Sequence, residues 1–190
     1  VTGDAAYADR AKAIMVTLVN QIESSPVMAG EDGIDGEFMA NGAGLAVGYD
    51  WLHGALPETY RAPLRDVLWR AAKVLRSPAS DTNQIIWLDG RLIAFGNYEP
   101  RWLWALTAVG LALWGENDDV PALLEFCRQT LAEVFIPALD LQDGGAWAEG
   151  PVYGFIAIWP RVQTALAWWT AAGENYFDDT RWWYDRLAYD

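Results

Sequence analysis

The stretch from Asp143 to Phe155, DGGAWAEGPVYGF, combines reactive side chains with a glycine-rich backbone that a ligand can approach closely. Glu149 and Tyr153 lie four residues apart, and a carboxylate and a phenol can both take part in proton transfer. Trp147 offers a flat apolar ring with one polar N–H, a combination that sugar-binding clefts use. A simple turn needs none of these groups. We therefore expect Trp147 to stack on a sugar, and Glu149 to fix the loop or hold a sugar hydroxyl.

The residues that follow predict the start of a helix. Gly150 can cap it, and Pro151 can be its first residue, where the missing N–H costs nothing. Tyr153 then lies in the first turn. A helix N-terminus stabilises a phenolate by only about 0.3–1 kcal/mol, whereas lowering a tyrosine pKa from about 10 to about 7 needs roughly 4 kcal/mol. An ionised Tyr153 therefore requires a nearby cation, for which Arg101 and Arg161 are the candidates.

Hydrophobic periodicity predicts the elements that must position these groups. Strand signals are limited to QIIWL and RLIAF, which could form a short hairpin across the Asp-Gly pair between them. The connection from Ser77 to Pro100 is long enough that a functional role is expected. The sequence predicts one all-α domain over residues 1–190, built as an incomplete α/α toroid of antiparallel helical hairpins. The predicted helices cover about residues 5–24, 39–56, 56–77, 100–114, 120–139, 151–172 and 178–190, with the fourth buried on nearly all sides and a loop over 25–38.

Composition narrows the possible partners. The chain has 190 residues with 13 basic and 26 acidic side chains, and its net charge of −13 excludes a nucleic-acid binder, which needs a basic surface. No apolar run reaches the roughly 18 residues of a membrane span, so no membrane partner is expected. His53 is the only histidine, which excludes a multi-histidine metal site, and Cys127 is the only cysteine, which excludes an internal disulfide. We expect no metal or other cofactor, a structural His53 and a buried Cys127.

Three segments resemble one family of enzymes. Gly44 to Arg61, GLAVGYDWLHGALPETYR, is similar to a helix hairpin of the heparinase II/III-like and related alginate lyases. Phe95 to Asp118, FGNYEPRWLWALTAVGLALWGEND, resembles their asparagine-bearing loop and the helix that follows it. Asp143 to Trp168, DGGAWAEGPVYGFIAIWPRVQTALAW, resembles their DGG…EGP.Y stretch, and the order and spacing also match over roughly residues 39–177. The resemblance implies an α/α toroid that precedes an antiparallel β-sheet domain in a longer chain.

The resemblance also implies a reaction. These lyases remove the C5 proton of a uronic acid and expel the glycosidic oxygen from C4, and a neutralised carboxylate, a base and an acid are needed. By motif, Asn97 is expected to neutralise the carboxylate with its amide, which has two donors, and Tyr153 to act as the acid and base. Many relatives have histidine where this chain has Tyr98. The expected substrate-binding residues are Tyr98, Arg101, Trp147, Glu149 and Arg161.

Other readings stay open. Asn97 could merely satisfy turn backbone after Gly96. An α/α glycoside hydrolase would need two carboxylates flanking one bond, and Glu149 could pair with Asp143 or Asp50. A non-catalytic helical module that binds a glycan or a protein is a third possibility.

The expected partner is an acidic polysaccharide or oligosaccharide, with alginate, heparan-type and other uronate chains all compatible. Self-association through the aromatic C-terminal segment TRWWYDRLAYD is also expected, because it carries a large apolar load. The chain begins at Val1, so we interpret it as a processed or excised segment of a periplasmic or secreted protein. Turnover by these 190 residues is expected to be slow or absent.

Overall fold

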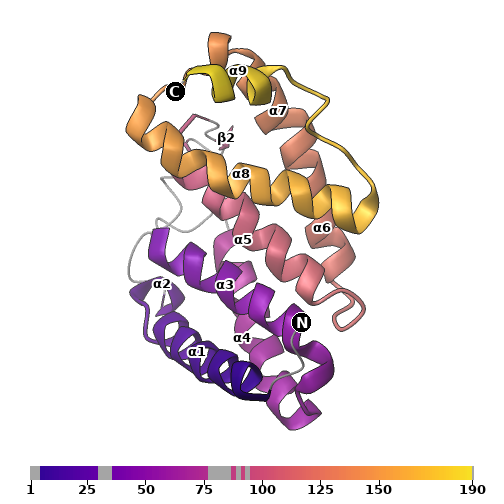
Figure 1. Cartoon of the computed structure of the whole chain (residues 1–190). Coiled ribbons are helices and arrows are strands. Elements are labelled where there is room, and N and C mark those ends of the chain that lie inside the picture. The colour runs from indigo at the N-terminus through magenta and orange to yellow at the C-terminus, as the bar shows by residue number, and fades with distance from the viewer. Residues whose placement is uncertain (1–4, 30–35, 77–86, 89–90, 93–94, 190) are drawn as a thin grey trace.

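The computed structural model describes residues 5–29, 36–76, 87–88, 91–92 and 95–189. These residues are mainly helical, so the predicted all-α class is confirmed (Figure 1). The longer helices are α1 (Ala5–Glu23), α3 (Gly36–Leu52), α4 (Glu58–Arg76), α5 (Tyr98–Ala112), α6 (Val120–Thr130), α8 (Pro151–Ala172) and α9 (Trp182–Tyr189). Shorter pieces are α2 (Pro26–Ala29), a 3-10 turn (His53–Ala55), a π-helix (Leu131–Phe135), α7 (Ile136–Asp140) and a turn at Asp143–Gly145.

Two predicted segments differ in detail. The expected loop over 25–38 contains α2, and α3 begins at Gly36 rather than near residue 39. The expected helix 120–139 is interrupted by one π turn just before Pro137, which follows Ile136 at the start of α7. Proline has no N–H to donate and its ring crowds the carbonyl four residues back, so a wider turn accommodates it.

The predicted hairpin is present as a minimal ladder. Strand β1 (Trp87–Leu88) pairs antiparallel with β2 (Arg91–Leu92), with Trp87 opposite Leu92. Most of the connection from Ser77 to Pro100, for which a functional role was expected, lies outside the described residues, as does the Asp-Gly pair of the hairpin.

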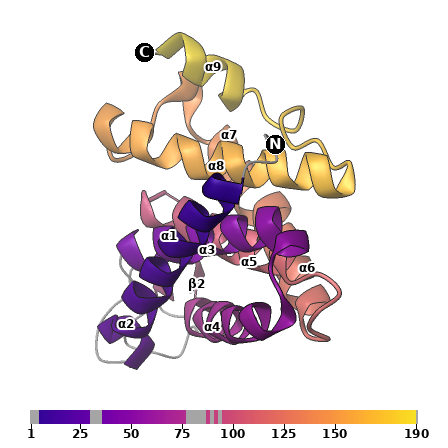
Figure 2. The same cartoon turned by 60° about the horizontal axis from the view of Figure 1, so that its bottom comes forward.

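Helices α3, α5 and α8 run in the same direction, side by side (Figures 1 and 2). Their starts lie together, because a methyl group at Gly36 would collide with the Arg101 guanidinium and Asn97 is hydrogen-bonded to Glu149. Their ends also lie together, since Trp51 and Ala171 line one groove. Helices α4 and α6 return in the opposite direction: the indole N–H of Trp102, in the first turns of α5, donates to the carbonyl of Leu75 at the end of α4 (2.6 Å).

Helix α5 forms the centre of the core. It packs against α3, α4, α6 and α8, and its buried residues lie on nearly all sides, so the predicted inner helix is confirmed. The reason is local, because α5 contains almost no residue that burial would penalise beyond Glu99, Arg101 and Thr107. Gly110 allows α6 to approach closely, since a Cβ there would lie 2.6 Å from a methyl of Leu124. Cys127 is fully buried as expected, and burial raises the pKa of its thiol to about 12.

Candidate active site at the starts of α5 and α8

The loops that precede α5 and α8 meet at one end of the helix layer. The Asn97 amide nitrogen donates to Oε1 of Glu149 at 3.0 Å, across 52 residues of sequence. The predicted helix start is confirmed: Gly150 caps α8 with a φ of +87°, and Pro151 is the first helical residue. The positive φ favours glycine, and it turns the chain so that Glu149 faces Asn97 while Tyr153 enters the first turn.

Glu149 is held from two sides. Trp147 donates its indole N–H to Oε2 of Glu149 at 3.1 Å, so each carboxylate oxygen accepts one hydrogen bond. Trp147 and Asn97 are both buried, whereas Glu149 is exposed. Glu149 therefore fixes the loop, as expected, and still offers remaining lone pairs to solvent or a hydroxyl. The Trp147 ring, for which sugar stacking was expected, is covered by protein.

Arg161 provides that cover. Its guanidinium carbon lies 4.0 Å from the centroid of the Trp147 ring, and only 4% of the residue is exposed. None of its three side-chain nitrogens has a hydrogen-bond partner among the described residues. Burial lowers the pKa of Arg161 to about 9, against the opposing effect of the Glu99 and Glu149 charges, so the group stays charged at neutral pH.

Arg161 is also distant from the phenol it was expected to serve. Eight residues separate it from Tyr153 on α8, which corresponds to about 12 Å along the helix axis. Arg161 therefore supports the indole behind the site, and its guanidinium faces the Trp147 ring rather than Tyr153.

Glu99 is a site residue that sequence reasoning missed. It lies two residues after Asn97 and is almost fully buried, and one of its carboxylate oxygens has no hydrogen-bond partner in the part of the chain that the structure describes. Burial raises the pKa of Glu99 to about 7, although the backbone N–H groups of Glu99 and Gly96 and the Arg161 charge oppose the rise. Gly96 allows this carboxylate to lie close to the backbone, because a Cβ there would lie 2.7 Å from both carboxylate oxygens. The signal in the sequence was an acid at the start of a helix with few other polar residues.

Three further predicted residues lie in the first turns of α5 and α8. Tyr153 is 48% exposed, while Tyr98 and Arg101 are half-buried. The Arg101 guanidinium lies 5.7 Å from the centroid of the Tyr98 ring, at a distance where a cation and a π-face attract. The end of the layer thus presents two phenols and a guanidinium, backed by the Asn97–Glu149–Trp147–Arg161 chain. That combination can bind an anion and move a proton.

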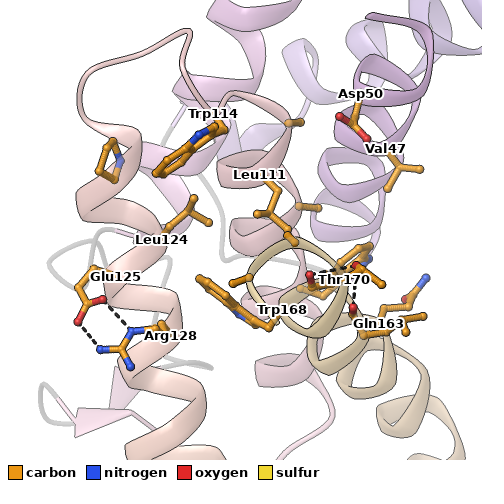
Figure 3. A pocket seen from close by; sticks show the side chains of 18 of the residues that line it. Val47, Asp50, Leu111, Trp114, Leu124, Glu125, Arg128, Gln163, Trp168 and Thr170 are labelled. Atoms are coloured by element: carbon orange, nitrogen blue, oxygen red, sulfur yellow. Dashed lines mark hydrogen bonds and ion pairs between the residues drawn. The ribbon is translucent and has the colours of Figure 1, made fainter. Parts of the chain in front are cut away.

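A groove leads away from this end along α5. Its first part has a volume of about 480 Å³ and lies between α3 and α8, with Arg101, Trp104 and Trp159 among its lining residues. Its second part, of about 930 Å³, shares Val47, Trp104 and Gln163 with the first and extends to the ends of the helices (Figure 3). Trp102 and Trp168 are buried in the core, whereas Trp104 is half-buried and lines both parts of the groove.

Of the two carboxylate pairs that the hydrolase alternative could use, the Glu149–Asp50 pair is too widely separated. Asp50 lies in the last turn of α3, roughly 20 Å along that helix from the end at which Glu149 is found. That separation is well beyond the 6.5–9.5 Å or less over which a pair of carboxylates can flank one glycosidic bond. The side chain of Asp143 lies outside the described residues.

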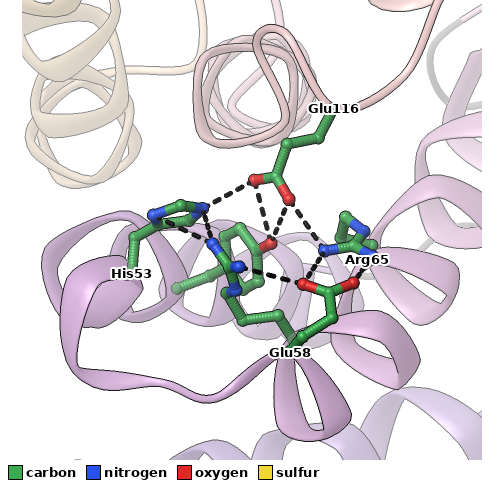
Figure 4. Close-up of polar contacts among 6 residues, drawn as sticks. His53, Glu58, Arg65 and Glu116 are labelled. Carbon is green, nitrogen blue, oxygen red and sulfur yellow. Dashed lines mark hydrogen bonds and ion pairs between the residues drawn. The ribbon is translucent and has the colours of Figure 1, made fainter.

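A second polar cluster lies at the opposite end (Figure 4). The Glu116 carboxylate accepts hydrogen bonds from the Tyr49 hydroxyl (2.9 Å) and Arg65 (2.8 Å), and His53 Nε2 lies 3.0 Å from it. Arg61 contacts the same imidazole, at 2.6 Å from Nε2. These contacts join the end of α3 to α4 and to the turn after α5, so the prediction of a structural histidine is confirmed.

Within the described residues, no group of three His, Cys, Asp or Glu side chains is arranged to hold a metal ion. In the same part of the chain, no helix is long and apolar enough to span a membrane. Comparison of the chain with protein-family models, curated proteins and solved structures found no match. The site is therefore interpreted from its geometry and from the three lyase-like segments alone.

Proposed function

We propose that this chain is the helical part of a polysaccharide lyase, an incomplete α/α toroid that binds uronic-acid polysaccharides and cleaves them by β-elimination. The direction of the helices supports the toroid, because α3, α5 and α8 form one parallel layer and α4 and α6 return along its outer side. An extracellular polysaccharide as substrate fits a periplasmic or secreted protein.

The observation that carries the proposal is the Asn97–Glu149 hydrogen bond. It joins the two lyase-like loops, which are far apart in sequence, and it brings Asn97 and the helix turn that carries Tyr153 to one end of the layer. Asn97 keeps one amide hydrogen for a uronate carboxylate, and Arg101 adds a positive charge nearby.

The elimination needs two proton movements. The C5 proton leaves to a base, its electron pair forms the C4–C5 double bond, and the C4–O bond breaks. The ionised Tyr153 takes the C5 proton and so becomes a neutral phenol, which then gives that proton to the departing glycosidic oxygen as the C4–O bond breaks. Because Tyr98 stands where many relatives have histidine, the histidine acid–base group of those relatives is replaced here, a loss that typically costs about 10²–10⁴ in rate. Turnover is therefore slow.

The test is an assay for ultraviolet-absorbing unsaturated product over alginate, heparan-type and other uronate polysaccharides, with binding measured in parallel. Tyr153→Phe removes one hydroxyl and should abolish product while binding is retained. Asn97→Ala should weaken both. Tyr184→Phe, on the exposed Tyr184 of α9, is the matched control and should leave both unchanged. Product formation at the wild-type rate by Tyr153→Phe would exclude the assigned acid.

A second candidate, a non-catalytic glycan-binding module, is favoured by the burial of Asn97 and the use of its amide by Glu149. A preorganised amide that is already hydrogen-bonded stabilises a developing carboxylate charge less than one aimed entirely at the substrate. The two candidates differ in the same assay: uronate binding that depends on Asn97, without any unsaturated product from the wild type, would establish the module and exclude the lyase.

A further inference from the structure

The far end of the groove exposes two indoles over one concave surface. Trp51 is 81% exposed and Trp114 is 63% exposed, and both line the 930 Å³ part of the groove. Trp51 comes from the end of α3, and Trp114 follows α5, so two separate elements contribute one ring each. Large aromatic rings gathered in a pocket, with polar groups beside them, are typical of a binding site rather than of a surface that only meets water.

The polar groups that line this part of the groove carry little positive charge. Asp50 is exposed beside Trp51. Glu125 and Arg128 are engaged with each other by a two-pronged ion pair, with nitrogen–oxygen distances of 2.7 and 2.8 Å, so the Arg128 charge is already compensated (Figure 3). Gln163 and Thr170 complete the polar lining that the structure describes. An anionic ligand would meet the Asp50 carboxylate here without an uncompensated described cation to offset it.

The near end has the opposite character. Arg101 lines the 480 Å³ part of the groove and lies over the Tyr98 ring beside the candidate active site. Thirteen residues of chain separate Arg101 from Trp114, which corresponds to roughly 20 Å along α5. One groove therefore offers a cationic end and, some distance away, an aromatic end with a carboxylate.

We propose that the Trp51–Trp114 end is a subsite for an uncharged sugar unit, which stacks its C–H faces on the two indoles and donates hydroxyl protons to Asp50 and Gln163. The sugar class rests on the proposed function, and the subsite deepens it. A ligand that fits both ends carries a uronate near Arg101 and a neutral sugar several units along. The preferred substrate is thus a heteropolysaccharide with both kinds of unit, rather than a pure uronate polymer.

The test follows the indole N–H signals of ¹⁵N-labelled protein by nuclear magnetic resonance, with cellohexaose as the neutral probe and hexamannuronate as the uronate probe. Cellohexaose should shift the Trp51 and Trp114 signals. Trp51→Ala and Trp114→Ala should each weaken its binding roughly 2- to 10-fold, the range expected for loss of one aromatic contact. Trp169→Ala is the matched control, because this indole is 51% exposed on α8 and lies outside both parts of the groove.

A second part of the experiment tests the effect of the Asp50 charge. Hexamannuronate should leave the Trp51 and Trp114 signals of the wild type unmoved, and Asp50→Asn should allow it to shift them. The subsite would be overturned by cellohexaose that leaves both indole signals unmoved, or by hexamannuronate that shifts them equally in the wild type. It would also be overturned if protein concentration alone shifted the Trp51 and Trp114 signals and no other indole signal, which would indicate a second copy of the chain in the groove. The lyase assay is independent: cellohexaose binding at Trp51, together with no unsaturated product from any of the uronate polysaccharides, supports the subsite and rejects the lyase.

Discussion

At the scale of single residues, the candidate site contains two buried ionisable side chains. Glu99 and Arg161 are both almost fully buried, and neither forms an ion pair at 4.0 Å or less with another described residue. Each influences the other through space, because the Arg161 charge lowers the Glu99 pKa and the Glu99 charge raises that of Arg161. Such an arrangement is expensive to maintain, so these residues are where pH should act on stability.

The first prediction concerns Glu99. Its pKa in the folded protein is about 7, against an ordinary value of 4.5. Between pH 4.5 and pH 7, Glu99 is therefore protonated in the folded state and ionised in the unfolded state. The contribution of protonated Glu99 to the free energy of unfolding is therefore fully present below pH 4.5 and is lost as the pH rises through 7. The free energy of unfolding should fall by on the order of 3 kcal/mol over this range. Glu99→Gln should remove this decline, as measured by urea unfolding at pH 5 and pH 7.5.

Glu125→Gln is the control for that experiment. Glu125 is exposed, and its pKa is lowered by the hydrogen bond from Arg128, so its contribution to stability changes only at more acid pH. This variant should keep the wild-type decline between pH 5 and 7.5. An equal decline in Glu99→Gln and the wild type would show that another group carries the pH dependence.

At the scale of elements, the second polar cluster, in which Tyr49, His53 and Arg65 contact Glu116, joins the α3–α4 hairpin to the turn after α5. Glu116→Ala removes the common acceptor of Tyr49, His53 and Arg65 and leaves their donors without it. Hydrogen bonds to a charged group contribute about 1.5–3 kcal/mol, so a loss of about 2–3 kcal/mol in the free energy of unfolding is expected. Asp66→Ala breaks an exposed pair with Arg70 and should cost less than about 0.5 kcal/mol. Equal costs for the two variants would mean that the cluster contributes nothing beyond a surface pair.

A second prediction at this scale concerns how α9 is held. Gly145 has a φ of +76°, and a Cβ on it would collide with the backbone of Asp185 and Arg186 in α9. Gly145→Ala should displace α9 and increase hydrogen exchange at Trp182 and Trp183, which are buried in the native protein. Gly144 also has a positive φ, +64°, but it faces open space, so Gly144→Ala should cost only the backbone strain of about 1–2 kcal/mol. Unchanged exchange in α9 of the Gly145→Ala protein would contradict the contact.

At the scale of the whole molecule, the apolar side chains of the C-terminal segment fall into a buried pair and an exposed pair. Trp182 and Trp183 are buried, and Trp182 packs edge-on against Trp147 with ring centroids 6.4 Å apart. Tyr184 and Leu187 are exposed on the outer side of α9. The expected self-association through this helix stays a prediction, and the exposed pair is now the surface that would carry it.

Sedimentation velocity from micromolar to millimolar concentration measures that association. Leu187→Glu should weaken it, because a charge would be buried at the contact, and the net charge of −13 should make association stronger at high salt. Ile14→Glu adds the same charge to an exposed apolar position of α1 and serves as the control. A monomer at every concentration, or equal weakening by both variants, would exclude α9 as the interface.

The sequence by itself determined the helices, their order and the buried character of α5, because periodicity and capping act within a few residues. The start of α8 at Gly150 and Pro151 is an example, since both residues act on the backbone next to them. The sequence also indicated that Asn97 and the loop before Tyr153 belong to one site, but only through the resemblance of three segments to one family.

Only the tertiary structure decided what those side chains contact. Asn97 meets Glu149 across 52 residues, Trp147 is covered by Arg161, and Glu99 is buried to the point that its pKa rises. The groove with Trp51 and Trp114 likewise exists only where α3, α5 and α8 pack together. The physical reason is that hydrogen bonding, desolvation and cavity shape depend on neighbours from distant segments, whereas helix formation depends mainly on neighbours along the chain.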